Sequence, residues 1–493
     1  MSVAIPLVGP QLTDADVRPH PLTGPAVERL IRRLAGAPSA AERDRIVAEF
    51  WAAAERRGTP LVEELDGEPG HRAVTFLWRG HRATRQVLLL GNRLADREHL
   101  AASLLRRIPD TDIWHLGLKL RADHRGSYQL AADVSPGEPP ADPRLLQERL
   151  RGLSRYAAPD PLNPRSLPTR WSPAGASVFA LSDAPAQPWA ERRAGIARGT
   201  VSRHRRPGGA LDGERDVWVY LPPGVDPAAT ADRLTTTDQD ATPNATTPDA
   251  DSAPDAATPE AVSAPDAITT ADANPAADPD PVAELPVLVL CDGDMWFGEL
   301  GFQDTLDALI ADGAVPPLAV LAPDAVDNPT RWGDLGGRDT YVSFLADLVL
   351  PWAAARWPLT TDPARTVIAG QSLGGVTALY AVHTRADRFG HALAQSASLW
   401  WRPGLPQGVP KTVSTETPWL VSLFTGAERR PVSVRLAVGL HEGRMVGDAR
   451  TLHAALDSLG YPVTRTEYNG GHDYACWRGC LADGLAATLG PAG

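Results

Sequence analysis

The chain has 493 residues, of which 43% are hydrophobic, so it is long enough to bury more than one core. Its formal net charge of -12 argues against a nucleic-acid-binding surface. No apolar run approaches the ~20 residues that a membrane span needs, and Met1 to Pro6 do not begin a secretory signal. The three cysteines, Cys291, Cys476 and Cys480, are too few for a disulfide framework, so we interpret them as reduced thiols of a cytoplasmic protein.

The first part of the chain, residues 1–190, is predicted to be a helical lead-in followed by a small β-sandwich. Apolar residues recur at helical spacing between residues 24 and 57. Residues 58–132 then change to short strands and turns, with the clearest strands at 73–78 and 86–90. Residues 135–200 are rich in proline, and we expect them to be mostly irregular.

Residues 228–284 are predicted to form a disordered acidic insert. They consist mainly of alanine, aspartate, proline and threonine, with Arg233 as the single base. Such a segment cannot bury enough apolar surface to offset its chain entropy. Strand-like segments lie on either side, at 216–223 and 285–290, so the insert is interpreted as an enlarged loop within one domain.

Residues 195–493, apart from this insert, are predicted to form an α/β domain with a largely parallel sheet. Strand-like and helix-like segments alternate from residue 285 to residue 490, a pattern typical of a sheet covered by helices on both faces. The clearer strands are expected at 286–291, 318–323, 365–369, 433–438 and 463–467. The fold class is therefore α/β, of the α/β-hydrolase type, preceded by a small β-sandwich.

The segment from Gly370 to Gly374 has the form G-x-S-x-G, with Ser372 at its centre. An apolar strand-like run precedes it and a helix-like run follows, which is the context of a nucleophile elbow. A serine hydroxyl needs a base, and His472 lies in a glycine-rich loop 100 residues later, in the chain order of α/β-hydrolases. We therefore predict Ser372 as nucleophile and His472 as general base, with His391 and His441 as rival histidines.

Several further motifs identify a resemblance that covers most of the chain. They are Asp292-Gly293-Asp294-Met295-Trp296, Ser396-Ala397-Ser398-Leu399-Trp400-Trp401, Gly470-Gly471-His472-Asp473 with Cys476-Trp477-Arg478-Gly479, and, nearer the N-terminus, Arg125-Gly126-Ser127-Tyr128 and Asp160-Pro161-Leu162-Asn163-Pro164. With these motifs the chain resembles the enterochelin (ferric-enterobactin) esterases, cytoplasmic serine hydrolases of bacterial iron acquisition. The resemblance implies an immunoglobulin-like N-terminal domain, an α/β-hydrolase domain and hydrolysis of the ester backbone of ferric catecholate siderophores.

The acid of the catalytic triad should follow the strand at 433–438 and orient His472. Glu442 stands where the family carries this acid, which makes it our first choice. Asp448 is the main alternative. Asp473 is a weaker one, because a side chain rarely reaches back to Nδ1 of the adjacent residue.

The oxyanion hole is expected to combine the N–H of Leu373 with one from the loop near Gly293 or Asp294. A bulky, anionic and aromatic ligand requires guanidinium groups and flat rings, although some of the tryptophans must belong to the core. The candidates for substrate binding are Arg331, Arg478, Trp296, Trp400, Trp401 and Trp477. No metal site and no cofactor are predicted, because iron would arrive on the oxygens of the siderophore.

Two departures from the family pattern leave the exact substrate open. The acidic insert is not a family feature, and Asp334 and Arg338 stand where the family has a glutamate and an asparagine. Two alternatives therefore remain: a serine hydrolase acting on another acyl ester or thioester, and a protein that binds ferric siderophore without cleaving it. The sequence does not predict the oligomeric state.

Overall fold

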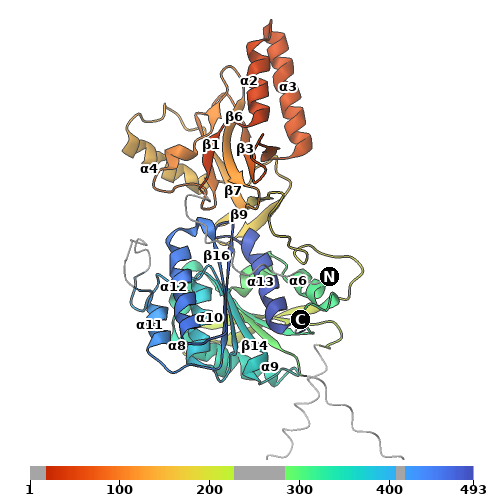
Figure 1. Ribbon diagram of the computed structural model, residues 1–493, viewed down its shortest axis with the longest axis vertical. Helices are drawn as coiled ribbons and strands as arrows, with labels where there is room; N and C mark the ends of the chain where they lie inside the picture. The colour runs from red at the N-terminus through yellow and green to blue at the C-terminus, as the bar shows by residue number, and fades with distance from the viewer. Residues whose placement is uncertain (1–17, 227–283, 407–416, 492–493) are drawn as a thin grey trace, which may run out of the picture.

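The computed structural model describes residues 18–226, 284–406 and 417–491. Figure 1 shows an N-terminal β-rich part standing on a larger α/β part, with the α2–α3 helix pair at the far end. The strands form three sheets of five, four and eight strands. The predicted acidic insert at 228–284 lies almost entirely outside the described residues.

The N-terminal part is a two-sheet sandwich. One sheet contains β1 (His20–Leu22), β2 (Leu61–Glu64), β3 (His71–Arg79), β5 (Arg106–Arg107) and β6 (Ile113–Arg121). The other contains β4 (Gln86–Gly91), β7 (Arg125–Asp133), β8 (Ser166–Thr169) and β9 (Ser172–Ala180). Phe76 of the first sheet packs edge-on against Tyr128 and Phe179 of the second, so one core lies between the two sheets.

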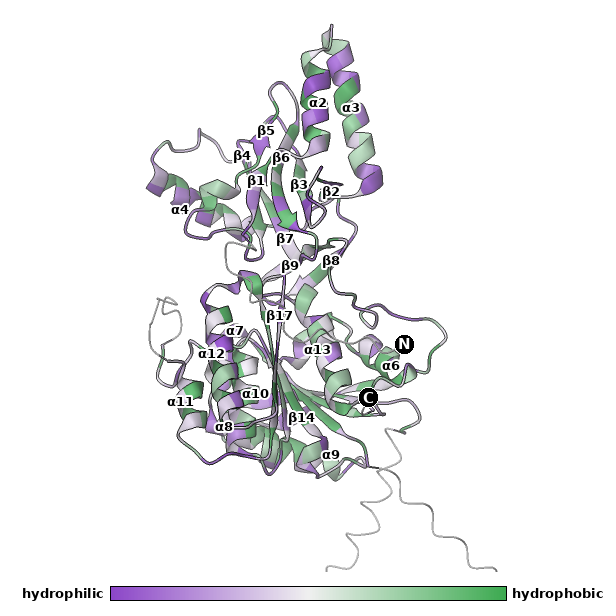
Figure 2. Cartoon of the chain, in the orientation of Figure 1, coloured by the Kyte–Doolittle hydropathy of each residue, from purple (hydrophilic) through white to green (hydrophobic). Residues whose placement is uncertain are grey.

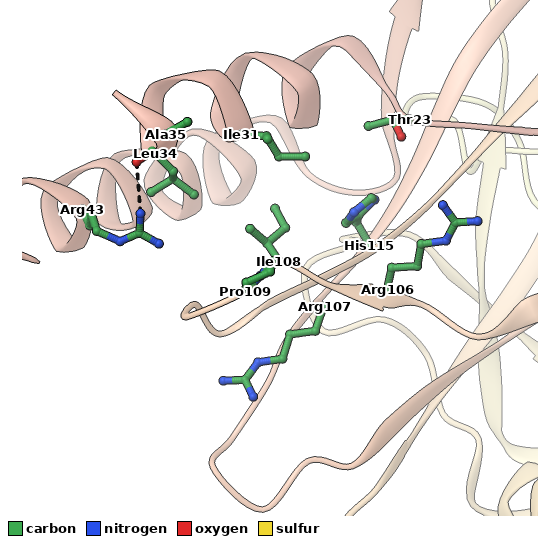
Figure 3. A pocket seen from close by; sticks show the side chains of 10 residues that line it. All are labelled: Thr23, Ile31, Leu34, Ala35, Arg43, Arg106, Arg107, Ile108, Pro109 and His115. Atoms are coloured by element: carbon green, nitrogen blue, oxygen red, sulfur yellow. Dashed lines mark hydrogen bonds between the residues drawn. The ribbon is translucent and has the colours of Figure 1, made fainter. Parts of the chain in front are cut away.

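Helices α2 (Pro25–Ala35) and α3 (Ala40–Arg57) cover the outer face of the five-stranded sheet. Both carry hydrophilic and hydrophobic residues in alternate bands (Figure 2), and their apolar residues pack on Leu77 and Ile113. Between α2 and the β5 segment lies a pocket of 380 Å³. Figure 3 shows its lining, which comes entirely from the N-terminal part: Thr23, Ile31, Leu34, Ala35, Arg43, Arg106, Arg107, Ile108, Pro109 and His115.

The expectation that residues 135–200 are mostly irregular is wrong for three elements. Helix α4 (Pro143–Leu153) begins with proline at a position where its missing N–H costs nothing, and Asp142 caps the first turn. Strands β8 and β9 form an antiparallel pair, which β9 joins to β7. The proline content therefore marks the start of a helix and a sheet edge as well as loops.

The α/β part is built on an eight-stranded sheet in the order β10-β11-β13-β12-β14-β15-β16-β17. Its strands are β10 (Thr200–Pro207), β11 (Glu214–Leu221), β12 (Val287–Leu290), β13 (Ala319–Pro323), β14 (Thr366–Gln371), β15 (His391–Gln395), β16 (Ser433–Gly439) and β17 (Val463–Tyr468). The pairs β10–β11 and β11–β13 are antiparallel, and the other neighbouring strands pair in parallel. The predicted α/β-hydrolase fold class is confirmed.

Helices cover both faces of this sheet, and each face has its own core. On one face α6 (Gln303–Ala311) and α13 (Tyr474–Leu489) pack through residues such as Leu306 and Leu481. The other face carries α10 (Leu373–Thr384), α8 (Asp339–Ser343), α9 (Leu350–Ala354), α11 (Trp419–Thr425) and α12 (Arg444–Ser458). In the part of the chain that the structure describes, no helix is both long and apolar enough to cross a membrane.

The carboxyl edge of the sheet, where the parallel strands end, and the amino edge, where they begin, carry different segments of the chain. The carboxyl ends of the parallel strands lead into Asp292, Ser372, Ser396, Glu442 and His472. At the opposite edge, Tyr220 near the end of β11 pairs with Val320, and β12 begins with Val287 opposite Ala319. The predicted insert is therefore attached at the amino edge of the sheet, away from these polar residues.

Candidate active site

Ser372 lies in a sharp turn between β14 and α10. It has φ 59° and ψ -117°, a strained conformation that holds its side chain at the carboxyl edge. The turn is possible because a Cβ at Gly370 would lie only 2.5 Å from the backbone carbon of Gly374. Ser372 is partly exposed, and its Oγ lies 3.1 Å from Oγ of the buried Ser398.

His472 follows β17, and Glu442 follows the neighbouring strand β16. His472 Nδ1 lies 2.5 Å from Oε2 of Glu442, whose side chain is fully buried. The other carboxylate oxygen accepts hydrogen bonds from Ser396 Oγ at 2.6 Å and from the Gly439 N–H at 2.8 Å. With the Nδ1 proton directed at Glu442, Nε2 is the ring nitrogen that can take a proton from a nucleophile.

Glu442 stays ionised in spite of its burial. Burial alone would raise the pKa of Glu442, but the charge of His472 and the hydrogen bonds from His472, Ser396 and Gly439 outweigh it, so the pKa is lowered. An ionised carboxylate at this point stabilises the positive charge that His472 acquires when it takes a proton.

The other candidate acids are engaged elsewhere. Asp448 pairs with Arg444, one turn away on α12, at 3.2 Å. Asp473 caps α13 through the Cys476 N–H and accepts a hydrogen bond from Ser127 Oγ at 2.8 Å. Neither contact directs the carboxylate at the ring of His472.

The rival histidines also have other partners. His391 is the first residue of β15, at the amino edge, where it contacts the Ala364 carbonyl at 2.8 Å and Ser433 Oγ at 2.7 Å. His441 Nε2 lies 2.7 Å from Asn469 Oδ1. The sheet brings Ser372, Glu442 and His472 to one edge and holds His391 at the other.

The loop that should supply part of the oxyanion hole is held by buried charges. Asp292 has φ 67° and receives two hydrogen bonds from Arg331, at 2.6 and 2.8 Å, and one from Gln371 Nε2 at 2.6 Å. A Cβ at Gly293 would lie 2.1 Å from the Ala322 carbonyl, so only glycine fits there. Because Gln371 precedes Ser372, this network ties the oxyanion loop to the elbow. Leu373 is the first residue of α10, where N–H groups lack intrahelical acceptors.

Comparison with known proteins identifies the family. Residues 73–190 match the family model described as "Enterochelin esterase, N-terminal", and residues 266–488 match the model "Putative esterase". The chain is 32% identical to the iron(III) salmochelin esterase of Escherichia coli O6:H1, over 90% of this chain and 94% of that protein. The chain belongs to the enterochelin esterase family.

Further relatives extend the match. The iron(III) enterobactin esterase of Dickeya dadantii is 30% identical, over 89% of this chain and 92% of its own. The crystal structure of ferric enterobactin esterase from Salmonella typhimurium is 26% identical, with a TM-score of 0.65, over 88% of this chain and 98% of that one. The enterobactin esterase structure from Shigella flexneri, at 24% identity and a TM-score of 0.67, shares the fold. Membership of this family makes the chain a hydrolase that acts on esters.

Three of the four tryptophans predicted to bind substrate are buried in this esterase. Trp296, Trp401 and Trp477 are among its largest fully buried side chains. Trp296 donates its N–H to Gln371 Oε1 at 3.2 Å and so steadies the residue before the nucleophile. Trp401 lies in a core cluster, and Trp400 is half-buried and stacked on Trp332.

Trp477 contacts the side chains around Glu442 and His472 instead of offering a face to a ligand. Its N–H donates to Ser396 Oγ at 2.9 Å, and that hydroxyl donates to Glu442. Its ring packs edge-on against His472, with the centroids 4.8 Å apart. The motif was correctly placed near the site, but the side chain points inward because the indole N–H needs a buried acceptor.

The two arginines predicted to bind substrate are also engaged by protein groups. Arg331 is buried and directs two of its N–H groups at Asp292. Arg478 contacts Gln187 Oε1 at 3.1 Å and Glu191 at 3.5 Å. Asp334, one of the departures from the family pattern, pairs with Arg215 at 2.9 Å. For Arg331, the buried carboxylate of Asp292 balances the charge that the sequence pattern assigned to a ligand.

Sequence reasoning missed three residues that the N-terminal sandwich brings to the site. Asn92 exchanges two hydrogen bonds of 3.0 Å with the backbone of His472. Arg170 and Trp171, in the turn between β8 and β9, reach Asp294 and the ring of His472. For Trp171, the signal available in the sequence was a tryptophan at a turn position where small polar residues are usual.

Proposed function

We propose that this esterase hydrolyses the ester backbone of ferric catecholate siderophores of the enterobactin class, with Ser372 as nucleophile, His472 as general base and Glu442 as the acid that orients it. The observation that carries the catalytic part is the 2.5 Å contact between His472 and a buried, ionised Glu442 beside the nucleophile elbow. The substrate class is supported by the names of the relatives, iron(III) salmochelin and iron(III) enterobactin esterases.

In the first half-reaction, the Ser372 Oγ proton passes to His472 Nε2 as Oγ attacks the ester carbonyl. The negative charge on the carbonyl oxygen is stabilised by the N–H of Leu373 together with one from the Gly293–Asp294 loop. When the tetrahedral intermediate collapses, the C–O bond of the substrate's ester breaks, and the departing alkoxide oxygen of the substrate takes the proton from His472.

In the second half-reaction, His472 removes a proton from water, and the hydroxide attacks the acyl-enzyme. Collapse releases the carboxylic acid and returns the proton to Ser372. Each cycle cuts one ester bond, so a cyclic triester gives first a linear trimer and then shorter pieces. Opening the scaffold weakens the chelate and so favours release of iron, which travels on the substrate throughout.

A chromatographic time course with iron(III) enterobactin and iron(III) salmochelin tests the proposal. The wild-type protein should produce linear trimer, dimer and monomer in succession, and Ser372→Ala should reduce the rate by ~10⁴ or more while leaving the fold intact. Cleavage of simple p-nitrophenyl esters without cleavage of either siderophore would favour another acyl ester as substrate. Tight binding with no cleavage would favour the sequestering role.

We also propose a cytoplasmic location. The three cysteines, Cys291, Cys476 and Cys480, are free thiols, which fits a reducing compartment. Fractionation of cells that express the tagged chain, with the tag's accessibility to added protease as readout, would test this.

A further inference from the structure

The turn between β8 and β9 belongs to the N-terminal sandwich but contacts the catalytic edge of the α/β sheet. Arg170 Nη2 lies 2.5 Å from Asp294 Oδ2 and 3.4 Å from Asp292 Oδ1, and only 8% of its side chain is exposed. The next residue, Trp171, lies against the residues around His472. Two adjacent side chains of one domain therefore reach both halves of the proposed active site of the other.

Trp171 stands beside the proposed general base. Its ring centroid lies 5.9 Å from that of His472, 6.2 Å from that of Tyr474 and 5.9 Å from that of Trp477. Tyr474 and Trp477 are buried, so Trp171 packs against rings that are themselves held in the core. Trp171 itself remains 51% exposed, which is unusual for so large an apolar side chain.

An indole that is fixed on one side and open on the other is suited to hold a flat aromatic group. Because its neighbour is the proposed base, a ring stacked on it would lie next to the ester under attack. Trp296, Trp401 and Trp477 are buried and cannot offer such a face. Trp171 does, and it comes from the domain that carries none of the proposed triad.

Arg170 acts on the other half of the site. The two carboxylates that it contacts flank Gly293, the glycine of the proposed oxyanion loop. Asp292 also binds Arg331 and Gln371, the residue before Ser372. Arg170 thus completes a chain of ion pairs and hydrogen bonds from the sandwich through the oxyanion loop to the nucleophile elbow.

We propose that the β8–β9 turn completes the active site, with Trp171 as the residue that binds an aromatic ring of the substrate and Arg170 as a positioning residue for the Gly293–Asp294 loop. The inference deepens the proposed function and rests on it for the identity of the aromatic group, a catecholate ring. The sandwich accordingly contributes residues to the active site of the esterase.

The test of Trp171 separates binding from chemistry. In a Ser372→Ala background, calorimetry with iron(III) enterobactin should show a Kd about tenfold higher for Trp171→Ala, and within about threefold of the parent for Trp171→Phe. Tyr156→Ala, which removes another exposed aromatic ring of the same domain, should leave Kd unchanged. With Ser372 intact, Trp171→Ala should lower kcat/KM for iron(III) enterobactin by a larger factor than for vinyl acetate, which has no aromatic ring.

These outcomes also separate the inference from the proposed function. An unchanged Kd in Trp171→Ala, absence of binding to the Ser372→Ala parent, or equal loss on vinyl acetate would overturn the role of Trp171. If wild-type protein binds iron(III) enterobactin without cleaving it, the proposed function fails, while the change in Kd on removal of Trp171 still supports the aromatic contact.

The positioning role of Arg170 is tested by measuring whether its substitution changes kcat or KM. Arg170→Met keeps much of the side chain's volume and should lower kcat about tenfold on both the siderophore and vinyl acetate with little change in KM, and Arg170→Lys should recover part of it. The matched control is Arg193→Met, which removes an ion pair, at 2.7 Å to Asp312, between the segment that connects the two parts and the α/β part. Unchanged kcat in Arg170→Met, or an equal loss in Arg193→Met, would show that Arg170 serves only to hold the parts together.

Discussion

The carboxyl and amino edges of the eight-stranded sheet each carry a histidine, but the two histidines have different hydrogen-bond partners. At the carboxyl edge, His472 meets a buried carboxylate, and the nucleophile elbow follows β14 at the same edge. At the amino edge, His391 meets a serine hydroxyl and a backbone carbonyl. The partner, and not the histidine, decides which of the two can act as a base, because only a fixed carboxylate stabilises the imidazolium that forms during the reaction.

The carboxyl edge itself holds two kinds of buried ion pair. Glu442 faces a histidine, whose ring can accept and release a proton, whereas Asp292 faces Arg331 and Arg170, which keep their charge. The first pair suits proton transfer, and the second suits a fixed geometry. The substitutions below separate these two roles and then contrast this edge with the other.

The largest effect is expected at Glu442. Glu442→Gln keeps the shape of the side chain but removes the charge that stabilises protonated His472, so kcat should fall by ~10³ to 10⁴ with little change in KM. Hydrolysis of p-nitrophenyl acetate and of iron(III) enterobactin should fall together. Asp448→Asn is the control, and a comparable loss in it would reverse the assignment of the acid.

Asp292→Asn should act mainly on stability. It leaves the Arg331 guanidinium buried without its carboxylate, which typically costs ~3 to 5 kcal/mol of unfolding free energy. Urea denaturation of the variant beside the wild type measures this loss. A variant of wild-type stability would mean that the ion pair does not hold the loop.

Acid should narrow this difference in unfolding free energy between wild type and Asp292→Asn. Burial alone would raise the pKa of Asp292, but the charge and hydrogen bonds of Arg331 and the charge of Arg170 lower it below its ordinary value of 3.8. A carboxyl with a lowered folded pKa contributes stability that is fully present above its unfolded pKa and is lost as the pH falls through the folded pKa. The gap in unfolding free energy between wild type and Asp292→Asn should therefore be constant above about pH 5 and narrow below pH 3.8. A gap that is as wide at pH 2.5 as at pH 6 would assign the loss to packing instead of charge.

At the amino edge, His391→Ala should leave kcat unchanged and cost only ~1 kcal/mol, the usual value of a partly exposed hydrogen bond. Thermal unfolding together with the esterase assay would measure both. A large loss of kcat would contradict the assignment of catalysis to the carboxyl edge alone.

Much of this arrangement was predictable because it depends on local patterns. Buried strands that alternate with helices and the G-x-S-x-G turn carry their own signals, and they led to Ser372 and His472 without any contact information. The orientation of Trp296, Trp477 and Arg331 was not predictable, because it depends on which buried acceptor or carboxylate lies nearby in three dimensions. Arg170 and Trp171 were missed for a related reason, since a proline-rich segment concealed the strands that carry them across to the other domain.

The smallest effect is expected for the predicted insert. Both ends of the segment, near Asp226 and Glu284, connect to strands at the amino edge, opposite the nucleophile elbow. Loop-closure entropy changes by only ~0.6 kcal/mol for each doubling of length, so replacing residues 228–283 by a linker of about ten residues should change stability by no more than ~1 to 2 kcal/mol, and upward if at all. Steady-state kinetics on iron(III) enterobactin should be the same for the shortened and full-length chains. A shortened protein that is stable but has a raised KM would show that the segment reaches around to the catalytic edge, and the two edges would then not be independent.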